Sequence, residues 1–197
     1  MPNWCANSLK IIATTPESEA KLAEIVRELA RAAAADDGAA IFNLIKPIPQ
    51  ALQIVSGWSG DAEEQAAREE SYRVNLDTYG YQNWYDYCVA EWGTKWDAGN
   101  TTYDLDGNQV TIYFDTAWSP PISIYYALEN MGFKVEATYV EQGMGYIGYY
   151  KDGRDNCEEL NDMVEMSDED PYENIHAQVD HFFTEAGITH SPMHMGG

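Results

Sequence analysis

The sequence predicts an α+β protein, in which helices cover one face of an antiparallel sheet and an acidic helical appendage follows. Two kinds of apolar pattern indicate this: some short segments alternate like strands, and others repeat at helical spacing. The elements also follow one another as strand, helix, strand, helices, hairpin, helix and hairpin, an order typical of such α+β domains. A hydrophobic fraction of 45% is sufficient for a buried core despite the high charge.

The first fifty residues predict a strand, a helix and a second strand. Residues 3–13 have the apolar pattern of a strand. Thr15 and Pro16 then supply an N-cap and a first-turn proline for a helix that ends before Gly38. The segment IFNLIKPIP (41–49) predicts a short strand, because it is apolar and two prolines close it. The apolar residues that recur at helical spacing are Leu22, Ile25, Val26 and Leu29.

The middle of the chain predicts one exposed helix, two hairpins and a helix between them. Residues 61–76 carry acidic residues in their first turn, and we expect this helix to cover the sheet loosely. Residues 102–114 predict two strands joined at Asp106-Gly107. Residues 119–132 predict a helix that begins after Ser-Pro-Pro and ends at a glycine. Residues 133–153 predict a second hairpin with a glycine-rich middle.

Residues 81–92 predict a helix with one continuous apolar stripe. Its centre is Cys88, and Gly93 ends the helix. A thiol at the centre of a buried stripe is inert, since forming a thiolate there is costly. We therefore interpret the stripe as packed core and not as a reactive site. The stripe consists of Tyr81, Trp84, Tyr85, Cys88, Val89 and Trp92.

Five motifs in this order resemble the YubB ferredoxin-like family of phages and conjugative plasmids: MPNWCANSLKI, FNLIKPIP, YGYQNWYDYCVAEWGTKWDA, FDTAWSPP and EQGMGYIGYY. The resemblance covers about residues 1–152 and implies a ferredoxin-like domain there, encoded by a mobile genetic element. Residues 153–197 remain as an acidic, partly helical appendage. The family has no characterised biochemical role, so the resemblance implies no catalytic residues.

No metal or cofactor site is expected from the motifs. Asp104, Asp106 and Asn108 alternate like a calcium loop, but Gln109 stands where that loop requires glycine, which favours a hairpin. GMGYIG at 143–148 has a dinucleotide-binding outline, but it lies inside a predicted hairpin. The four histidines lie near the C-terminus in a spacing that favours no structural metal site: His176, His181, His190 and His194.

Other candidate reactive groups also favour ordinary structural roles. The three cysteines have no CxxC spacing, which favours neither a disulfide framework nor a zinc site. Asp97, Asp115 and Glu141 could form a carboxylate cluster for a metal, but solvated or locally paired carboxylates are commoner. Pro2 could act as an N-terminal amine, yet no supporting groups are evident. We therefore lean toward a protein that is not an enzyme.

Charge is the most extreme property of the chain. It has 33 acidic and 11 basic residues, a formal net charge of -22. Such a field repels nucleic acid and anionic membranes and attracts basic surfaces. A compact chain of this length is about 42 Å across, and duplex DNA of that length carries about 25 phosphates.

With no signal peptide and no apolar run long enough to span a membrane, we expect a protein of the host bacterial cytoplasm.

The sequence therefore favours a non-enzymatic binding protein that mimics DNA or RNA and occupies a basic surface of a host defence protein. High charge that only confers solubility is the alternative explanation. The acidic residues expected to form the partner surface are Glu158, Glu159, Asp162, Glu165, Asp168, Glu169, Asp170 and Glu173.

Two further functions stay open. One is a small-ligand or nucleotide-binding protein, or an enzyme, with an aromatic-lined pocket near Trp92, Trp96 and Trp118. The other is an accessory protein in phage replication or assembly, which the sequence does not separate from the first hypothesis.

Overall fold

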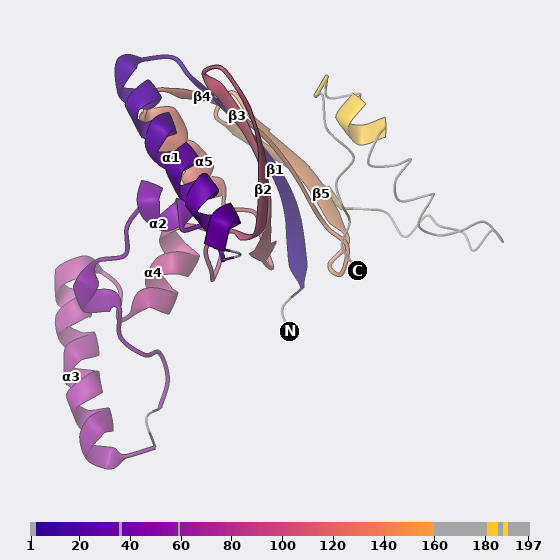
Figure 1. The fold of residues 1–197 in the computed structure, drawn as a ribbon. Coiled ribbons are helices and arrows are strands. Elements are labelled where there is room, and N and C mark those ends of the chain that lie inside the picture. The colour runs from indigo at the N-terminus through magenta and orange to yellow at the C-terminus, as the bar shows by residue number, and fades with distance from the viewer. Residues whose placement is uncertain (1–2, 36, 59, 160–180, 185–186, 189–197) are drawn as a thin grey trace.

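A computed structural model describes residues 3–35, 37–58, 60–159, 181–184 and 187–188, and these residues build a six-stranded antiparallel sheet with helices (Figure 1). The strand order is β2-β3-β1-β4-β5-β6. The first four strands have the ferredoxin-like arrangement, and β5 and β6 extend the sheet beyond β4. The elements are β1 (Trp4–Ala13), α1 (Pro16–Ala35), α2 (Ile41–Ile45), the 3-10 turn η1 (Gln50–Leu52), α3 (Ala62–Tyr79), α4 (Trp84–Glu91), β2 (Gly99–Asp106), β3 (Gln109–Ala117), α5 (Ile122–Asn130), β4 (Phe133–Glu141), β5 (Tyr146–Lys151) and β6 (Arg154–Glu159).

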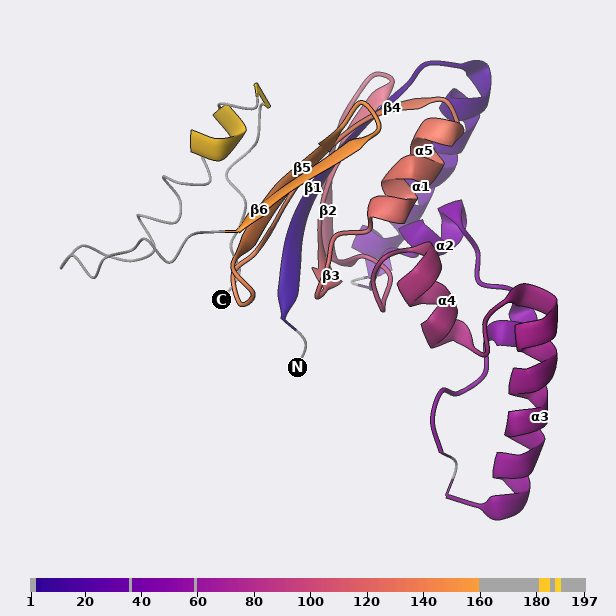
Figure 2. The ribbon, with the colours of Figure 1, turned by 180° about the vertical axis from the view of Figure 1, so that it is seen from behind.

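The main core lies between the sheet and helices α1 and α5. Along β1, buried and less buried residues alternate, because successive side chains point to opposite faces of a strand. Leu9 lies opposite Ile112 of β3 and Ala137 of β4, and all three are buried on the helix side. Both helices cover this same face, and Figure 2 shows the arrangement from behind. This confirms the predicted α+β fold with helices on one face of an antiparallel sheet.

Local signals in the sequence place the elements as expected at several points. The Thr15 hydroxyl accepts a hydrogen bond from the Ser18 backbone N–H at 3.1 Å, which caps the start of α1. The β2–β3 hairpin turns at Gly107 with φ of 59°, a conformation that glycine adopts readily. The hairpins at 102–114 and 133–153 and the helix at 119–132 are all confirmed.

Residues 41–45 form helix α2, so the predicted strand over 41–49 is wrong. A tertiary contact explains the difference. The carboxylate of Asp97 accepts hydrogen bonds from the backbone N–H groups of Phe42 and Asn43, at 2.8 and 2.9 Å. These N–H groups lie in the first turn of α2, where a helix has no partners of its own for them. The cap is 54 residues away in sequence, and no local pattern reveals it.

Helix α3 forms as predicted but does not cover the sheet, which corrects the second part of that expectation. It projects from the lower end of the molecule in Figure 1, away from the strands. Asn75 is its one buried residue. The Asn75 amide donates to the backbone carbonyls of Ala51 and Gln82, and the Tyr72 hydroxyl donates to the carbonyl of Val55. Polar contacts to the neighbouring loop therefore position α3, because the helix lacks a continuous apolar face.

The sheet continues past residue 152, where we expected the domain to end. Strand β6 pairs with β5 in antiparallel register, and all six of its residues are exposed. Residues 181–184 are helical, and Phe183 and Ile188 are buried against Val140 and Ile147. Val140 and Ile147 lie opposite each other in the β4–β5 register. Residues 181–184 and 187–188 thus pack on the sheet face opposite to α1 and α5 (Figure 1).

Among the described residues, no helix combines the length and the apolar character that a membrane crossing requires.

Candidate functional site

Three aromatic side chains lie around the ammonium group of Lys95, and a fourth, Trp4, packs against one of them. We call these five residues the Lys95 cluster: Trp4, Tyr85, Lys95, Trp96 and Trp118. The Lys95 Nζ lies 4.4 Å from the ring centroid of Trp96, 5.6 Å from that of Trp118 and 5.7 Å from that of Tyr85. The rings of Trp4 and Trp96 are 6.0 Å apart. These distances are within the range of cation–π attraction and aromatic packing.

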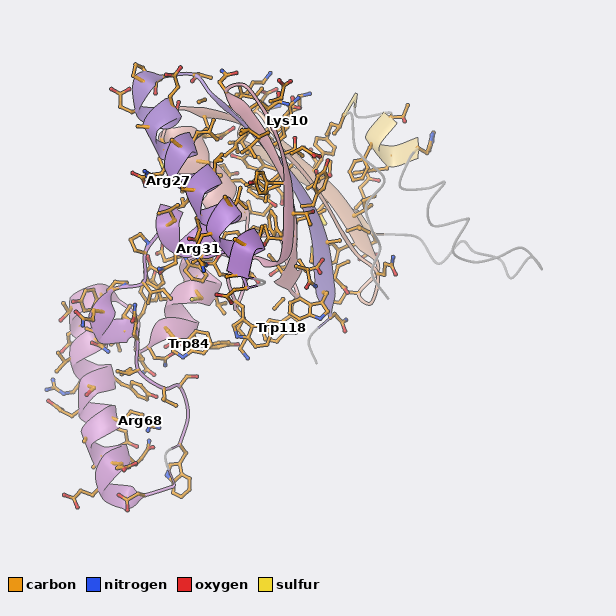
Figure 3. All side chains as sticks on the ribbon, in the orientation of Figure 1. Lys10, Arg27, Arg31, Arg68, Trp84 and Trp118 are labelled. Atoms are coloured by element: carbon orange, nitrogen blue, oxygen red, sulfur yellow. The ribbon has the colours of Figure 1, made fainter. Side chains whose placement is uncertain are left out.

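The Lys95 cluster is assembled from distant parts of the chain. Trp4 begins β1 and lies opposite Ala117, the last residue of β3. Trp118 is the residue after Ala117, so it lies close to Trp4. Trp118 has φ of 69°, an uncommon conformation for a large residue, and its backbone N–H donates to the carbonyl of Asn3 at 3.0 Å. The Tyr146 hydroxyl donates to the Trp118 carbonyl. Figure 3 shows Trp118 near the ends of the strands, at the level of Trp84 on α4.

Two of the three predicted pocket residues belong to the Lys95 cluster, and the third does not. Trp96 and Trp118 are 37% and 38% exposed, and Trp4 is 46% exposed, so these rings form an open surface. Trp92 is buried, packs against Phe42, and donates its ring N–H to the Lys46 carbonyl at 2.9 Å. The sequence does not indicate Trp4 and Tyr85 as members, because the β1–β3 register and the fold of residues 93–98 bring them together.

The cysteine in the centre of α4 is buried, as the stripe predicted. Burial raises the pKa of the Cys88 thiol to about 12, so a reactive thiolate does not form near neutral pH. Burial also raises the pKa of Cys5 to about 12, whereas Cys157 is exposed on β6. Val89 is 44% exposed, so the predicted stripe is less continuous than expected. Helix α4 is short and covers only the edge of the core (Figure 1).

Each of the three carboxylates considered as a metal cluster accepts hydrogen bonds from other groups of the chain. Asp97 holds α2, Asp115 accepts from the Asn100 amide at 2.8 Å, and Glu141 accepts from the backbone N–H of Gly143 at 2.9 Å. Burial raises the pKa of Asp97 to about 6 despite its backbone hydrogen bonds. Within the part of the chain that the structure describes, no group of three or more His, Cys, Asp or Glu side chains is placed to hold a metal ion.

The remaining sequence motifs lie in hairpins, on the helical turn at 181–184 or outside the described residues. Asp104 and Asp106 lie on β2 of the predicted hairpin. The GMGYIG segment joins β4 to β5, as the predicted hairpin requires. His181 is exposed on the helical turn at 181–184. Pro2 and the other three histidines lie outside the described residues: His176, His190 and His194.

Two of the eight predicted partner-binding acidic residues lie in the described part of the chain. Glu158 and Glu159 are exposed at the end of β6, which is an edge strand of the sheet formed by the described residues. Acidic side chains on such an edge also prevent uncontrolled strand pairing. The other six lie outside the described residues: Asp162, Glu165, Asp168, Glu169, Asp170 and Glu173.

The acidic excess persists in the described residues alone. Nine of the 33 acidic residues lie outside them and none of the 11 basic ones does, which leaves 24 acidic against 11 basic residues. Five of the basic residues form ion pairs within the chain, and Lys95 lies against aromatic rings. The five are Lys21, Arg31, Lys46, Arg73 and Lys151. Internal pairing therefore occupies many of the cations and leaves a negative surface.

Part of this surface lies on a projecting segment that we call the α3 arm, residues 50–80 without residue 59. It carries six acidic and two basic residues. Trp58 and Val55 on the arm are 73% and 64% exposed. A large apolar side chain surrounded by charged residues is the usual composition of a protein-binding surface. The acidic residues of the arm are Asp61, Glu63, Glu64, Glu69, Glu70 and Asp77.

One comparison with known proteins, a match to a family model, agrees with this fold. Residues 91–182 match the family model described as "Ferredoxin-like domain in Api92-like protein". The match covers the part of the chain that runs from the end of α4 through the strands β2 to β6. A search of curated proteins gave no match. The crystal structure of protein api92 from Yersinia pseudotuberculosis aligns with a TM-score of 0.43 at 13% identity, over 82% of this chain and 99% of that one.

Proposed function

We propose that this protein is a non-enzymatic binding module of a mobile genetic element that occupies a basic, nucleic-acid-binding surface of a host defence protein. The acidic excess of 24 to 11 over the described residues carries the proposal. A negative surface of this size favours partners rich in arginine and lysine, and it accelerates their association. Because the same field repels phosphates, direct binding of DNA or RNA is disfavoured.

The acidic groups have positions from which a partner could bind them. Glu158 and Glu159 lie on an exposed edge strand, and the α3 arm projects from the sheet (Figure 1). Carboxylates at such exposed positions can pair with arginine and lysine in the way that phosphates do. We expect Trp58 to lie at the centre of the contact and the acidic residues of the arm to surround it.

The test begins with nuclease-treated affinity purification of the tagged protein from bacteria at low and high salt. The proposal predicts one stoichiometric nucleic-acid-binding partner that high salt releases, because screening weakens contacts between exposed charges. Duplex DNA should compete with the protein for that partner. Binding that is insensitive to salt, or simultaneous binding of DNA and protein, would refute mimicry.

A matched pair of double variants locates the contact. Glu63→Gln with Glu64→Gln removes two charges from the first turn of α3, and Glu17→Gln with Glu19→Gln removes two from the first turn of α1. Net charge changes equally in both proteins. If the α3 arm is the docking element, we expect about a tenfold loss of affinity for the first pair and less than about twofold for the second. Equal losses would show that only the overall field matters.

A second candidate function rests on the Lys95 cluster. Exposed tryptophan rings beside an ammonium group can stack on a flat ring and bind an anionic group of the same ligand. A nucleotide has both parts. Titration with a panel of nucleotides should then change the tryptophan fluorescence of the wild type but not of a Trp118→Ala variant. An unchanged spectrum across the panel would contradict this candidate.

A further inference from the structure

The sheet face opposite to α1 and α5 contains a small polar cavity of about 190 Å³. Strands β1, β3 and β4 form its floor, and Ile188 lies at its side. In the floor, Lys10 of β1 lies between Thr111 of β3 and Glu136 of β4, and Ser8 lies next to Thr138. Figure 3 labels Lys10 on the strand at this face. The cavity is therefore built on the rigid centre of the sheet.

One buried hydroxyl that lines this cavity has no hydrogen-bond partner among the described residues. Thr138 is 4% exposed, and its Oγ1 atom makes no hydrogen bond there. Buried polar atoms in folded proteins are nearly always paired. Since the hydroxyl lines a cavity, a molecule bound in the cavity would supply the missing partner.

The charged and polar groups around Thr138 favour an anionic occupant. Glu136 is already paired with Lys151, whose Nζ lies 3.2 Å from its carboxylate oxygen. Lys10 forms no ion pair within the described part of the chain, so its ammonium group is free to bind an anion. The side chains of Ser8 and Thr111 also line the cavity and make no hydrogen bond to a described residue. An ammonium group beside three hydroxyl groups is a typical environment for an oxyanion.

The volume limits the size of the occupant. Pockets for drug-sized ligands and cofactors usually measure about 300–1,000 Å³, and a water molecule takes about 30 Å³. A cavity of 190 Å³ is thus too small for a nucleotide and large enough for an ion of a few heavy atoms. We propose that this cavity is a binding site for a small oxyanion, either phosphate or a short carboxylate, which Lys10 and Thr138 bind together.

The experiment is a titration of the full-length protein with inorganic phosphate and, separately, with succinate, at constant ionic strength. Amide and methyl NMR shifts of Lys10, Thr138 and their strand neighbours should change and saturate with at least one of the two ions. Saturation with phosphate alone or with succinate alone identifies the class of ligand. If neither ion gives saturable shifts at the cavity, the proposal is wrong.

Three variants separate a specific site from general charge attraction. Lys10→Met removes the ammonium group, and Thr138→Val removes the hydroxyl while keeping the shape of the side chain. Lys134→Met is the control, because Lys134 lies on the same face of β4 but does not line the cavity. We expect the first two variants to weaken binding about tenfold and about fivefold, and the control to change it less than twofold. Equal weakening by Lys10→Met and Lys134→Met would overturn the assignment.

Discussion

Asp97 makes a distinct contribution to the pH dependence of this protein's stability. Its carboxylate accepts backbone hydrogen bonds from Phe42, Asn43 and Ala98 at 2.8 to 2.9 Å, and it links α2 to the segment that carries Trp96. Burial is the largest influence on this group and raises its pKa from 3.8 to about 6. The backbone hydrogen bonds act in the opposite direction but do not compensate for burial.

The direction of the pH effect follows from this shift. Between about pH 4 and pH 6, Asp97 holds its proton in the folded protein and has lost it in the unfolded chain. The folded state therefore binds more protons, and Asp97 makes the free energy of unfolding fall as pH rises through this window. The rise in the pKa of Asp97 from 3.8 to about 6 lowers the free energy of unfolding by about 3 kcal/mol, and this loss is complete above pH 6.

Replacing Asp97 tests this assignment. Asp97→Ala leaves three N–H groups without an acceptor, each worth about 1 kcal/mol, so we expect a destabilisation. The loss should be smallest near pH 7 and should grow by about 3 kcal/mol toward pH 4, because the wild type alone gains stability on acidification. Urea unfolding of both proteins at each pH measures the difference, in which the other titrating groups largely cancel.

Asp97→Asn is the matched control. Its side chain does not titrate in this range either. The difference in free energy of unfolding between wild type and Asp97→Asn should therefore change with pH as it does for Asp97→Ala, and the two variants should differ only by an amount that is independent of pH. A difference between wild type and either variant that stays constant from pH 4 to pH 7 would refute the raised pKa of Asp97.

Three further predictions concern packing and reactivity. Thr138→Val should raise the free energy of unfolding by about 1–3 kcal/mol in urea titration without added anion, because it removes an unpaired buried hydroxyl; a destabilised variant would contradict this. Gly148→Ala should destabilise by about 1–3 kcal/mol or more, since its Cβ would lie 2.2 Å from the Tyr139 ring, whereas Gly38→Ala has room and should be nearly neutral; equal effects would refute the packing argument. A thiol reagent should label only the exposed Cys157 in the native protein and all three cysteines after unfolding; rapid native labelling of a second thiol would contradict the burial described above.

Local patterns were sufficient to predict most of the sheet and the helices that cover it. The alternation in β1, the turn at Asp106-Gly107 and the cap of α1 are properties of adjacent residues, and the structure has each of them. Helix α2 could not be predicted, because a short apolar segment fits a strand or a helix equally well. Its capping group is the distant carboxylate of Asp97.

Strand β6 and the position of α3 were missed for other reasons. The sequence of β6, RDNCEE, is polar on both faces, so it lacks the alternation that identifies a strand. Pairing with β5 determines its conformation. The surface pattern of α3 correctly indicated an exposed helix, but exposure does not specify which part of the domain a helix contacts.

Local sequence patterns predict only part of each candidate site, because distant segments of the chain build both sites. The sequence predicts Trp96 and Trp118 in one aromatic site, since both lie in aromatic-rich motifs. Trp4 joins them only through the β1–β3 register, and Trp92 is excluded because its ring points into the core. The oxyanion cavity on the open sheet face combines residues from three strands and from position 188, a combination that no local motif announces.

The most direct test of the proposed function is competition between this protein and duplex DNA for the partner that nuclease-treated affinity purification recovers. The proposed function predicts a nucleic-acid-binding partner that holds either DNA or this protein, and an affinity that falls steeply as salt rises. A partner that binds both at once, or that stays bound at high salt, would contradict the proposed function. Repeated recovery of the protein alone would also contradict it.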